Sequence, residues 1–414
     1  MVAPFPPGPE KLAAVRSALP ALAAGIYLNT GSVGPLPAET AAAMAQVAAW
    51  ERDVGRSHPD AFEDLLARMA EARAGVAAVL GTDVDAVALT HSTTDAMNAG
   101  TLAAAGAGSG GRVVTSRHEH LGGLGPLFAM RDRGIAEMEI VDAGDDGDDA
   151  RTLAAFDAAI TPDTRLVSIS HVAWTTGAVL PVAGIAELAH ARGARLIVDG
   201  AQAAGAIPFR FDELGADFYA VPAQKWLLGP EGMGALVVRP SLMRTTTPGL
   251  GGFFSFERGG GDGVSDWWRD ARRFESSSGY HRPSVVGMGR SIGWLSMYVG
   301  LDYVWDRGPA MARAAVRRLA AIPGVTVLTP VDRMATLVTF RIAGWSSEAA
   351  LAELGARVFA IARTITSLDA LRISVGFFTS EEELERLAEA VELLASHTAE
   401  TLPPRRQLAM LDES

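Results

Sequence analysis

The chain has 414 residues, 49% of them hydrophobic and 20% charged, which is typical of a globular protein with two or so domains and a sizeable core. Its formal net charge of −12 argues against a nucleic-acid or anionic-membrane partner. Cysteine is absent, so disulfides, cysteine-ligated metals and any mechanism that needs an enzyme thiol are excluded, and no metal site is expected.

The N-terminal residues carry no recognisable targeting segment. Residues 1–10 are rich in proline and lack both a basic region and an apolar stretch of signal-peptide length, so we expect an arm there. No apolar run reaches the about 18 residues that a membrane-spanning helix needs. The cytoplasm is therefore the expected location.

Helices are expected before the first strand of the main sheet. Residues 11–24 are predicted to form a short helix, and residues 36–80 an alanine-rich helical region with a break near Gly55. Between them, residues 26–37 read as an extended piece that ends in glycine and proline, which suits a loop lining a cleft.

Seven short apolar strands then recur, and helical stretches separate the first five. This alternation predicts a mainly parallel sheet with both faces covered. Ligands bind at the carboxyl ends of the strands in such sheets. The expected strands are residues 86–90, 112–116, 138–142, 165–170, 195–199, 218–222 and 234–238.

The pattern changes after residue 240. A long glycine-rich loop over residues 241–285 is followed by a long helix over 285–306 and then by alternating helices and strands up to a terminal helix from Ser380. We therefore expect an α/β protein with a large domain over residues 25–285. Residues 1–24 and 286–414 are expected to form a smaller α+β domain with an N-terminal arm.

Lys225 is the central candidate for chemistry. Only Lys11 and Lys225 are lysines among the 36 basic residues, and Lys225 lies mid-chain in an apolar stretch. Arginine could supply a point charge there, but only a primary amine can lose its proton and attack a carbonyl. Schiff-base formation explains Lys225 best, and a surface lysine left by chance is the alternative.

Polar side chains follow the expected strands at their carboxyl ends. Asp199 ends one strand and Gln202 follows it; an aspartate in an apolar pocket needs a cation, such as a protonated pyridine nitrogen, although a helix N-cap is the alternative. Thr93 and Thr94 open a helix, where they either bind phosphate or cap the helix. His120 follows the second strand, where it either stacks on a planar ring or is simply solvated.

Taken together, these motifs resemble the class V aminotransferase family of fold-type I pyridoxal-phosphate enzymes. That family includes cysteine desulfurases and isopenicillin-N-epimerase-like proteins, and the resemblance spans roughly residues 25–395. In chain order the motifs are Tyr-Leu-Asn at 27–29, Thr-His-Ser-Thr-Thr at 90–94, Glu-His at 119–120, Ser-His-Val at 170–172, Val-Asp-Gly-Ala-Gln at 198–202, Gln-Lys-Trp at 224–226, Arg-Phe-Glu-Ser-Ser-Ser at 273–278 and Leu-Arg-Ile-Ser at 371–374.

The resemblance implies a role for each matching residue around pyridoxal phosphate. Lys225 would form the Schiff base, Asp199 would pair with the pyridine nitrogen, and Gln202 would donate a hydrogen bond to the phenolic oxygen. His120 would stack on the ring. The residues implied to hold the phosphate are Thr93, Thr94, Gln224 and, from the other subunit of a homodimer, Ser278.

On the substrate side, the resemblance implies that Arg372 grips the α-carboxylate of an amino acid in a bidentate fork, with Asn29 as a further candidate. Two positions depart from the family pattern. Gln224 replaces the histidine that precedes the lysine in the desulfurases. Trp174 stands where many members have an asparagine near the cofactor oxygen, and we expect it to narrow the substrate pocket.

We therefore expect an enzyme that acts on the α-carbon of an amino acid, with Lys225 moving the proton. Transamination is favoured, C–S lyase activity comes second and epimerisation third. Ordinary cysteine desulfurase activity is excluded, because no cysteine can accept the sulfur. A nucleotide-binding oxidoreductase is disfavoured because no G-x-G-x-x-G follows the first strand, and a non-catalytic cofactor-binding protein is the alternative from another class.

Overall fold

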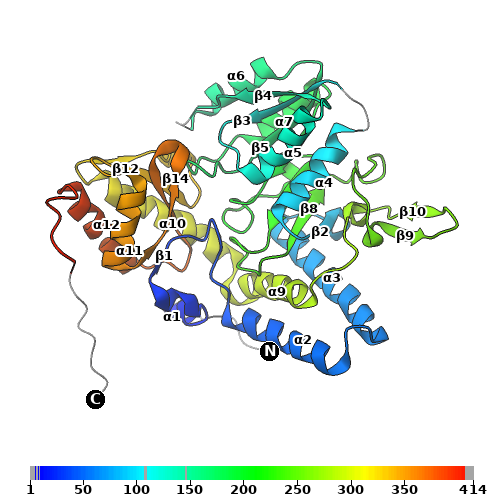
Figure 1. Ribbon diagram of the computed structural model, residues 1–414, viewed down its shortest axis with the longest axis horizontal. Coiled ribbons are helices and arrows are strands. Elements are labelled where there is room, and N and C mark those ends of the chain that lie inside the picture. The colour runs from blue at the N-terminus through cyan, green and yellow to red at the C-terminus, as the bar shows by residue number, and fades with distance from the viewer. Residues whose placement is uncertain (1–4, 6–7, 9, 107–109, 145–146, 406–414) are drawn as a thin grey trace.

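The main sheet has seven strands, as predicted. The computed structural model describes residues 5, 8, 10–106, 110–144 and 147–405 (Figure 1). The strands of this sheet are β2 (Val87–Thr90), β3 (Arg112–Ser116), β4 (Glu137–Val141), β5 (Thr164–Ser170), β6 (Arg195–Asp199), β7 (Phe218–Pro222) and β8 (Gly234–Val238). Their order is β2-β8-β7-β6-β5-β3-β4, and only β8 runs antiparallel to its neighbours. The predicted α/β fold with a mainly parallel sheet is confirmed.

Helices cover the sheet and explain why its strands are apolar throughout. Every residue of β2, β7 and β8 is buried, as expected for strands covered on both faces. Helix α4 (Thr93–Ala105) packs across β6, β7 and β8, and a Cβ at its Gly100 would lie 2.6 Å from the side chain of Ile197. The other helices of this unit are α5 (Leu121–Asp132), α6 (Asp149–Ala159), α7 (Val182–Ala191) and α8 (Phe211–Leu214).

A helical layer of α2 (Ala38–Val54), α3 (Pro59–Leu80) and α9 (Arg282–Gly293) packs beside the sheet. The expected break between α2 and α3 falls at Gly55, whose φ is +92°. The single helix expected over residues 285–306 is interrupted instead. A π-helical segment, Trp294–Val299, follows α9, and Gly300 with φ +86° precedes α10 (Leu301–Ala320), because a left-handed residue cannot continue a right-handed helix.

The second unit is built on a four-stranded antiparallel sheet in the order β11-β12-β15-β14, beside the main sheet in Figure 1. Ile26 and Leu28 pack in the core of this unit rather than in the larger core. Its elements are α10, β11 (Val325–Val327), β12 (Leu337–Ile342), α11 (Ser347–Val358), β13 (Ala360–Ile361), β14 (Arg363–Ile365), β15 (Ala370–Ser374) and α12 (Glu381–Ala395), with β1 (Ile26–Tyr27) paired to β13.

Three further elements complete the described chain. Helix α1 (Glu10–Ser17) lies near the N-terminus, and β9 (Phe256–Gly259) and β10 (Ser265–Trp267) form a hairpin inside the expected glycine-rich loop. Short 3-10 turns cover Pro20–Ala24, Val84–Ala86, Phe253–Ser255, Ala271–Phe274, Val331–Arg333 and Thr366–Leu368. Within the described ranges, none of the helices combines the length and the apolar character that a membrane crossing requires.

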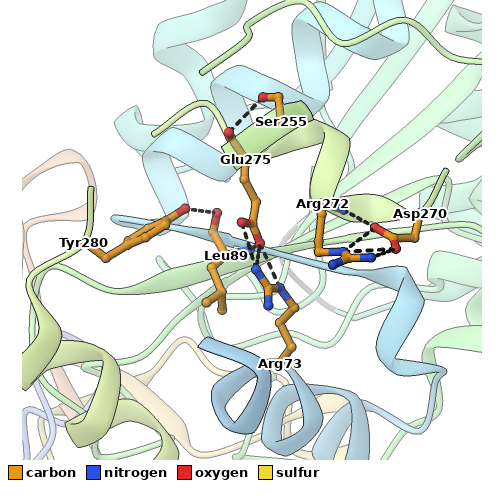
Figure 2. Close-up of polar contacts among 7 residues, drawn as sticks. All are labelled: Arg73, Leu89, Ser255, Asp270, Arg272, Glu275 and Tyr280. Atoms are coloured by element: carbon orange, nitrogen blue, oxygen red, sulfur yellow. Dashed lines mark hydrogen bonds and ion pairs between the residues drawn. The ribbon is translucent and has the colours of Figure 1, made fainter. Parts of the chain in front are cut away.

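The free edge of strand β2 is capped by the segment that follows the hairpin (Figure 2). The N–H of Leu89 donates to Glu275 Oε1 at 2.9 Å, and the hydroxyl of Tyr280 donates to the Leu89 carbonyl at 2.7 Å. Arg73 of α3 donates two hydrogen bonds of 2.9 Å to the fully buried Glu275 carboxylate, and the Ser255 hydroxyl donates to the Glu275 carbonyl. These contacts fix the strand that leads directly into residues 90–94.

Candidate active site

A cavity of about 250 Å³ opens at the carboxyl ends of the parallel strands. It brings together most of the site residues that the sequence predicts, from segments that lie far apart in the chain. Its walls are formed by Gly31, Ser32, Ser92, Thr93, Thr94, His120, Gly122, Trp174, Asp199, Ala201, Gln202, Gln224, Lys225, Arg363 and Arg372. Of the predicted site residues, only Asn29 and Ser278 are not part of these walls.

Lys225 follows β7 in a tight turn that reaches the cavity. The N–H of Gly34 donates to the Gln224 carbonyl at 2.7 Å, and a Cβ at Gly34 would lie only 2.3 Å from the Lys225 carbonyl oxygen. Burial lowers the pKa of Lys225 to about 8; the charges of Arg372 and Arg363 lower it further, and Asp199 opposes them. A substantial fraction of this amine is therefore unprotonated near neutral pH, as a nucleophile requires.

Asp199 is a buried carboxylate at the end of β6 that forms no ion pair within the described part of the chain. Its Oδ1 accepts the N–H of Ala201 at 2.9 Å. Asp199 attracts the charge of Lys225 without touching it, which leaves space between the two groups. A buried carboxylate without a protein cation fits the protonated pyridine nitrogen expected from the sequence.

The turn after β2 supplies hydroxyl groups that the helix cap does not use. Ser92 caps α4 by accepting the N–H of Asp95 at 3.1 Å, so Thr93 and Thr94 are free from that task. A Cβ at Gly122 would lie 2.7 Å from the hydroxyl oxygen of Thr94, so only glycine leaves this wall open. The arrangement fits a phosphate at the N-terminus of α4.

Gln224 faces the same wall of the cavity. Its Oε1 is buried and has no hydrogen-bond partner among the described residues. Buried polar atoms normally have a partner, so this orphaned amide indicates that a ligand completes the site. The amide group is able to donate to a phosphate oxygen, in agreement with the role that the sequence predicts.

His120 presents a neutral imidazole. Its Nδ1 accepts the N–H of Gly122 at 3.1 Å, so the ring proton lies on Nε2. Burial, helped by the charge of Lys225, lowers the pKa of His120. The ring meets Trp174 edge to face at 5.2 Å. An uncharged ring held in this way suits stacking on a planar cofactor.

Arg372 is a cation that the chain leaves uncompensated. It is 0% exposed on β15, and its only hydrogen bond in the described structure runs from Nη1 to the Trp174 carbonyl at 2.9 Å. Burial and the charge of Arg363 lower the pKa of Arg372 to about 9. Since a buried guanidinium needs an anion, this geometry fits a ligand carboxylate.

Arg363 is a second cation at the site, and the sequence reasoning missed it. It pairs in register with Arg372 across β14 and β15, and its guanidinium lies 5.3 Å from the Trp174 ring centroid. It reaches Ser32 Oγ at 3.4 Å but forms no ion pair with any described acid. The pairing of two short strands creates this neighbour, and no local pattern around Arg363 signals it.

Glu119 is another functional candidate to which the sequence reasoning gave no role. Its carboxylate is buried and accepts the hydroxyls of Ser116 and Ser170, both at 2.6 Å. Burial raises the pKa of Glu119 to about 7, with a smaller contribution from the charge of Asp199, while the two hydroxyls act in the opposite direction. A glutamate directly after an apolar strand, and directly before His120, was the available signal.

The two remaining predicted residues lie outside the cavity walls. Asn29 Oδ1 accepts the hydroxyl of Ser32 at 2.8 Å, so Asn29 contacts the cavity through its neighbour. Ser278 is exposed three residues after the buried Glu275. Their predicted roles in substrate and phosphate binding stay predictions. Within the described ranges, no group of three or more histidine, aspartate or glutamate side chains is placed to hold a metal ion.

Comparisons with known proteins agree with this geometry. The sequence model of the Aminotransferase class-V family matches residues 26–387. The isopenicillin N epimerase of Streptomyces clavuligerus is 32% identical over 390 residues, which cover 89% of this chain and 94% of that protein. A probable cysteine desulfurase of Mycolicibacterium paratuberculosis is 29% identical over 345 residues, which cover 78% of this chain and 48% of that protein.

Solved structures give the same answer for the fold. The cystine C-S lyase C-DES, in complex with its reaction product cysteine persulfide, aligns with a TM-score of 0.83 at 25% identity, covering 90% of this chain and 99% of that chain. A mutant of C-DES with glycine covalently linked to the PLP cofactor aligns with a TM-score of 0.84 at 25% identity, covering 91% and 98%.

Proposed function

Because the chain belongs to the class V aminotransferase family, we propose that it is an enzyme that removes the proton from the α-carbon of an amino acid. Its cofactor is pyridoxal phosphate. When bound, this cofactor supplies a conjugated ring that stabilises the negative charge left on the α-carbon. The observation that carries the proposal is Lys225, a buried amine whose pKa is lowered to about 8 beside an unpaired Asp199.

The residues of the cavity divide the work of holding and reacting. Thr93, Thr94 and Gln224 would hold the phosphate, and Asp199 would keep the pyridine nitrogen protonated. Lys225 would anchor the cofactor and, once displaced by the substrate amine, would accept the α-proton and return it. The lowered pKa of Lys225 supports this role, because a base must be unprotonated before it acts.

The destination of the returned proton decides the overall reaction. Transamination, which the sequence favoured, results when Lys225 delivers the proton to the cofactor instead of the α-carbon. Epimerisation returns it to the other face of the α-carbon, and elimination expels a sulfur substituent from the β-carbon. The relatives named as an epimerase and a C-S lyase support the last two as second candidates.

We further propose that the substrate carries a second anionic group. Arg372 would take the α-carboxylate, because its Nε and Nη2 have no partner in the described structure. Arg363 is a second cation beside it, and the described acids leave it unpaired as well. Two neighbouring guanidinium groups repel each other, so a ligand with two negative charges would stabilise both.

An absorbance experiment tests the proposed function. Protein purified with added pyridoxal phosphate should show a visible band that Lys225→Ala abolishes and that the matched control Lys11→Ala retains. Lys11 is a fair control because it is the only other lysine and lies far along the chain, with its amine over the Tyr303 ring. A wild-type protein without the band, or a band that survives Lys225→Ala, would contradict the proposal.

A substrate screen then separates the three reactions. Neutral and acidic amino acids are added with and without a 2-oxo acid, and amino-group transfer, pyruvate, sulfide and stereochemistry are measured together. Amino-group transfer that depends on the 2-oxo acid identifies a transaminase. Release of pyruvate with a sulfur product identifies a lyase, and loss of optical purity alone identifies an epimerase.

We also propose a homodimer with shared active sites. Ser278 is exposed and lies outside the cavity of its own chain. It stands on a segment held firmly by the buried Glu275, as a group presented to a neighbour would be. This arrangement supports the predicted donation of Ser278 to the phosphate site of the other subunit.

A further inference from the structure

The orientation of the Gln202 amide is fixed by a neighbouring tryptophan. Trp226 Nε1 donates to Gln202 Oε1 at 3.0 Å, and Gln202 Nε2 donates to the Gly31 carbonyl at 2.9 Å. An indole nitrogen only donates, so the amide oxygen must face Trp226. Both side chains are buried, each 4% exposed, so water does not compete for these bonds.

These two contacts leave one N–H of Gln202 uncommitted. An amide nitrogen carries two hydrogens, and the Gly31 carbonyl accepts one of them. Gln202 lines the cavity together with Lys225 and Asp199, so the second N–H is available to a ligand there. If the amide were turned over, an oxygen would face the ligand instead, and it would repel an oxyanion.

We propose that Trp226 is a positioning residue that holds Gln202 with its N–H toward the phenolic oxygen of the bound cofactor. The inference rests on the proposed function, since it requires pyridoxal phosphate in the cavity. Trp226 directly follows Lys225, so one turn of the chain sets both the anchoring amine and this donor. A Cβ at Gly205, whose φ is +85°, would lie 2.9 Å from the Trp226 carbonyl oxygen, so a close-fitting backbone surrounds the turn.

A donor at the phenolic oxygen has a measurable consequence. That oxygen shares a proton with the nitrogen that joins Lys225 to the cofactor, and a hydrogen bond from Gln202 draws electron density away from it. The nitrogen is then less basic. Removing the fixed donor should make it more basic and raise the pH at which the visible band of the holoenzyme titrates.

The experiment is a double-mutant cycle read by this pH midpoint in the holoenzyme. We expect Trp226→Phe and Gln202→Leu each to raise the midpoint by roughly one pH unit, about the value of one hydrogen bond to a charged group. If Trp226 acts through Gln202, the double variant shifts no further than Gln202→Leu alone. Trp305→Phe is the matched control, because the indole N–H of Trp305 has no partner in the described structure, and it should leave the midpoint unchanged.

Two results would overturn the inference: Trp226→Phe leaves the midpoint unchanged while Gln202→Leu raises it, or the two shifts add in the double variant. Should Trp226→Phe not fold, Gln202→Glu still accepts from Trp226 and offers no donor, so it must raise the midpoint, and an unchanged value would likewise reject the inference. A wild-type protein that shows no visible band contradicts the proposed function itself, which keeps the two failures distinct.

Discussion

Two buried carboxylates at the rim of the sheet have opposite surroundings. Asp199 accepts one backbone N–H and forms no ion pair among the described residues, so it stays available to a cationic ligand. Glu119 accepts two serine hydroxyls at 2.6 Å, one on each oxygen, so its hydrogen bonds are made within the protein. Single residues of one chemical type are thus divided between binding and positioning by what the neighbouring strand ends present.

The raised pKa of Glu119 predicts a pH-dependent effect on stability. Burial raises this pKa from 4.5 to about 7, so the folded state binds the proton more tightly than the unfolded state. The contribution of Glu119 is then fully present below about pH 4.5 and is lost as the pH rises through about 7. Glu119→Gln does not titrate, and its amide is able to bond both serines.

The free energy of unfolding of Glu119→Gln, minus that of the wild type, should therefore grow between about pH 5 and pH 8, by up to about 3 kcal/mol. Urea unfolding of the cofactor-free protein at several pH values measures this difference. Glu139→Gln, at an exposed glutamate of β4, should give a flat difference. A flat difference for Glu119→Gln as well would contradict the assignment.

At the scale of elements, sequence patterns predicted what depends on local burial. The seven strands of the main sheet are apolar runs because both faces are covered, and their bounds differ from the expected ones by a residue or so. Most of the site followed, because parallel strands bring their carboxyl ends to one rim. Arg363 was not predictable in this way, since its place beside Arg372 depends on the pairing of β14 with β15. The β9–β10 hairpin was likewise hidden in a glycine-rich stretch without alternating apolar residues.

The buried Arg73–Glu275 pair, which joins α3 to the cap on strand β2, should contribute strongly to stability. Arg73→Met leaves the carboxylate of Glu275 buried without its cation, so we expect a loss of about 3–5 kcal/mol in the free energy of unfolding. Adding Glu275→Gln should restore part of the loss, because an amide oxygen still accepts the Leu89 N–H and carries no charge.

The matched control lies in the same view. Asp270 and Arg272 also form an ion pair in Figure 2, but Arg272 is partly exposed, so Arg272→Met should cost less than about 1 kcal/mol. Chemical denaturation of the four variants measures all of these values. Equal losses for Arg73→Met and Arg272→Met would show that burial does not set the contribution of the first pair.

On the scale of the whole molecule, one apolar surface has no partner within the described chain. A groove of about 780 Å³ lies between α3 and the β9–β10 hairpin, away from the candidate active site. Around it Phe62, Leu66 and Phe253 are 45%, 42% and 64% exposed. The hairpin projects from the body of the protein in Figure 1. Exposed apolar patches of this kind mark protein interfaces, and the proposed second copy of the chain would cover it.

If that surface lies in the dimer interface, charges placed on it should separate the subunits. Phe253→Asp and Leu66→Asp would each bury an unpaired carboxylate, so we expect dimer dissociation to become at least roughly thirtyfold easier. Phe359→Asp is the control, because Phe359 is 48% exposed on the second unit. Sedimentation of the holoenzyme across a concentration series measures the change, and cofactor retention should fall with dissociation if Ser278 reaches the other subunit's phosphate. A wild-type species of 43.3 kDa at every concentration would exclude both the dimer and this role of Ser278.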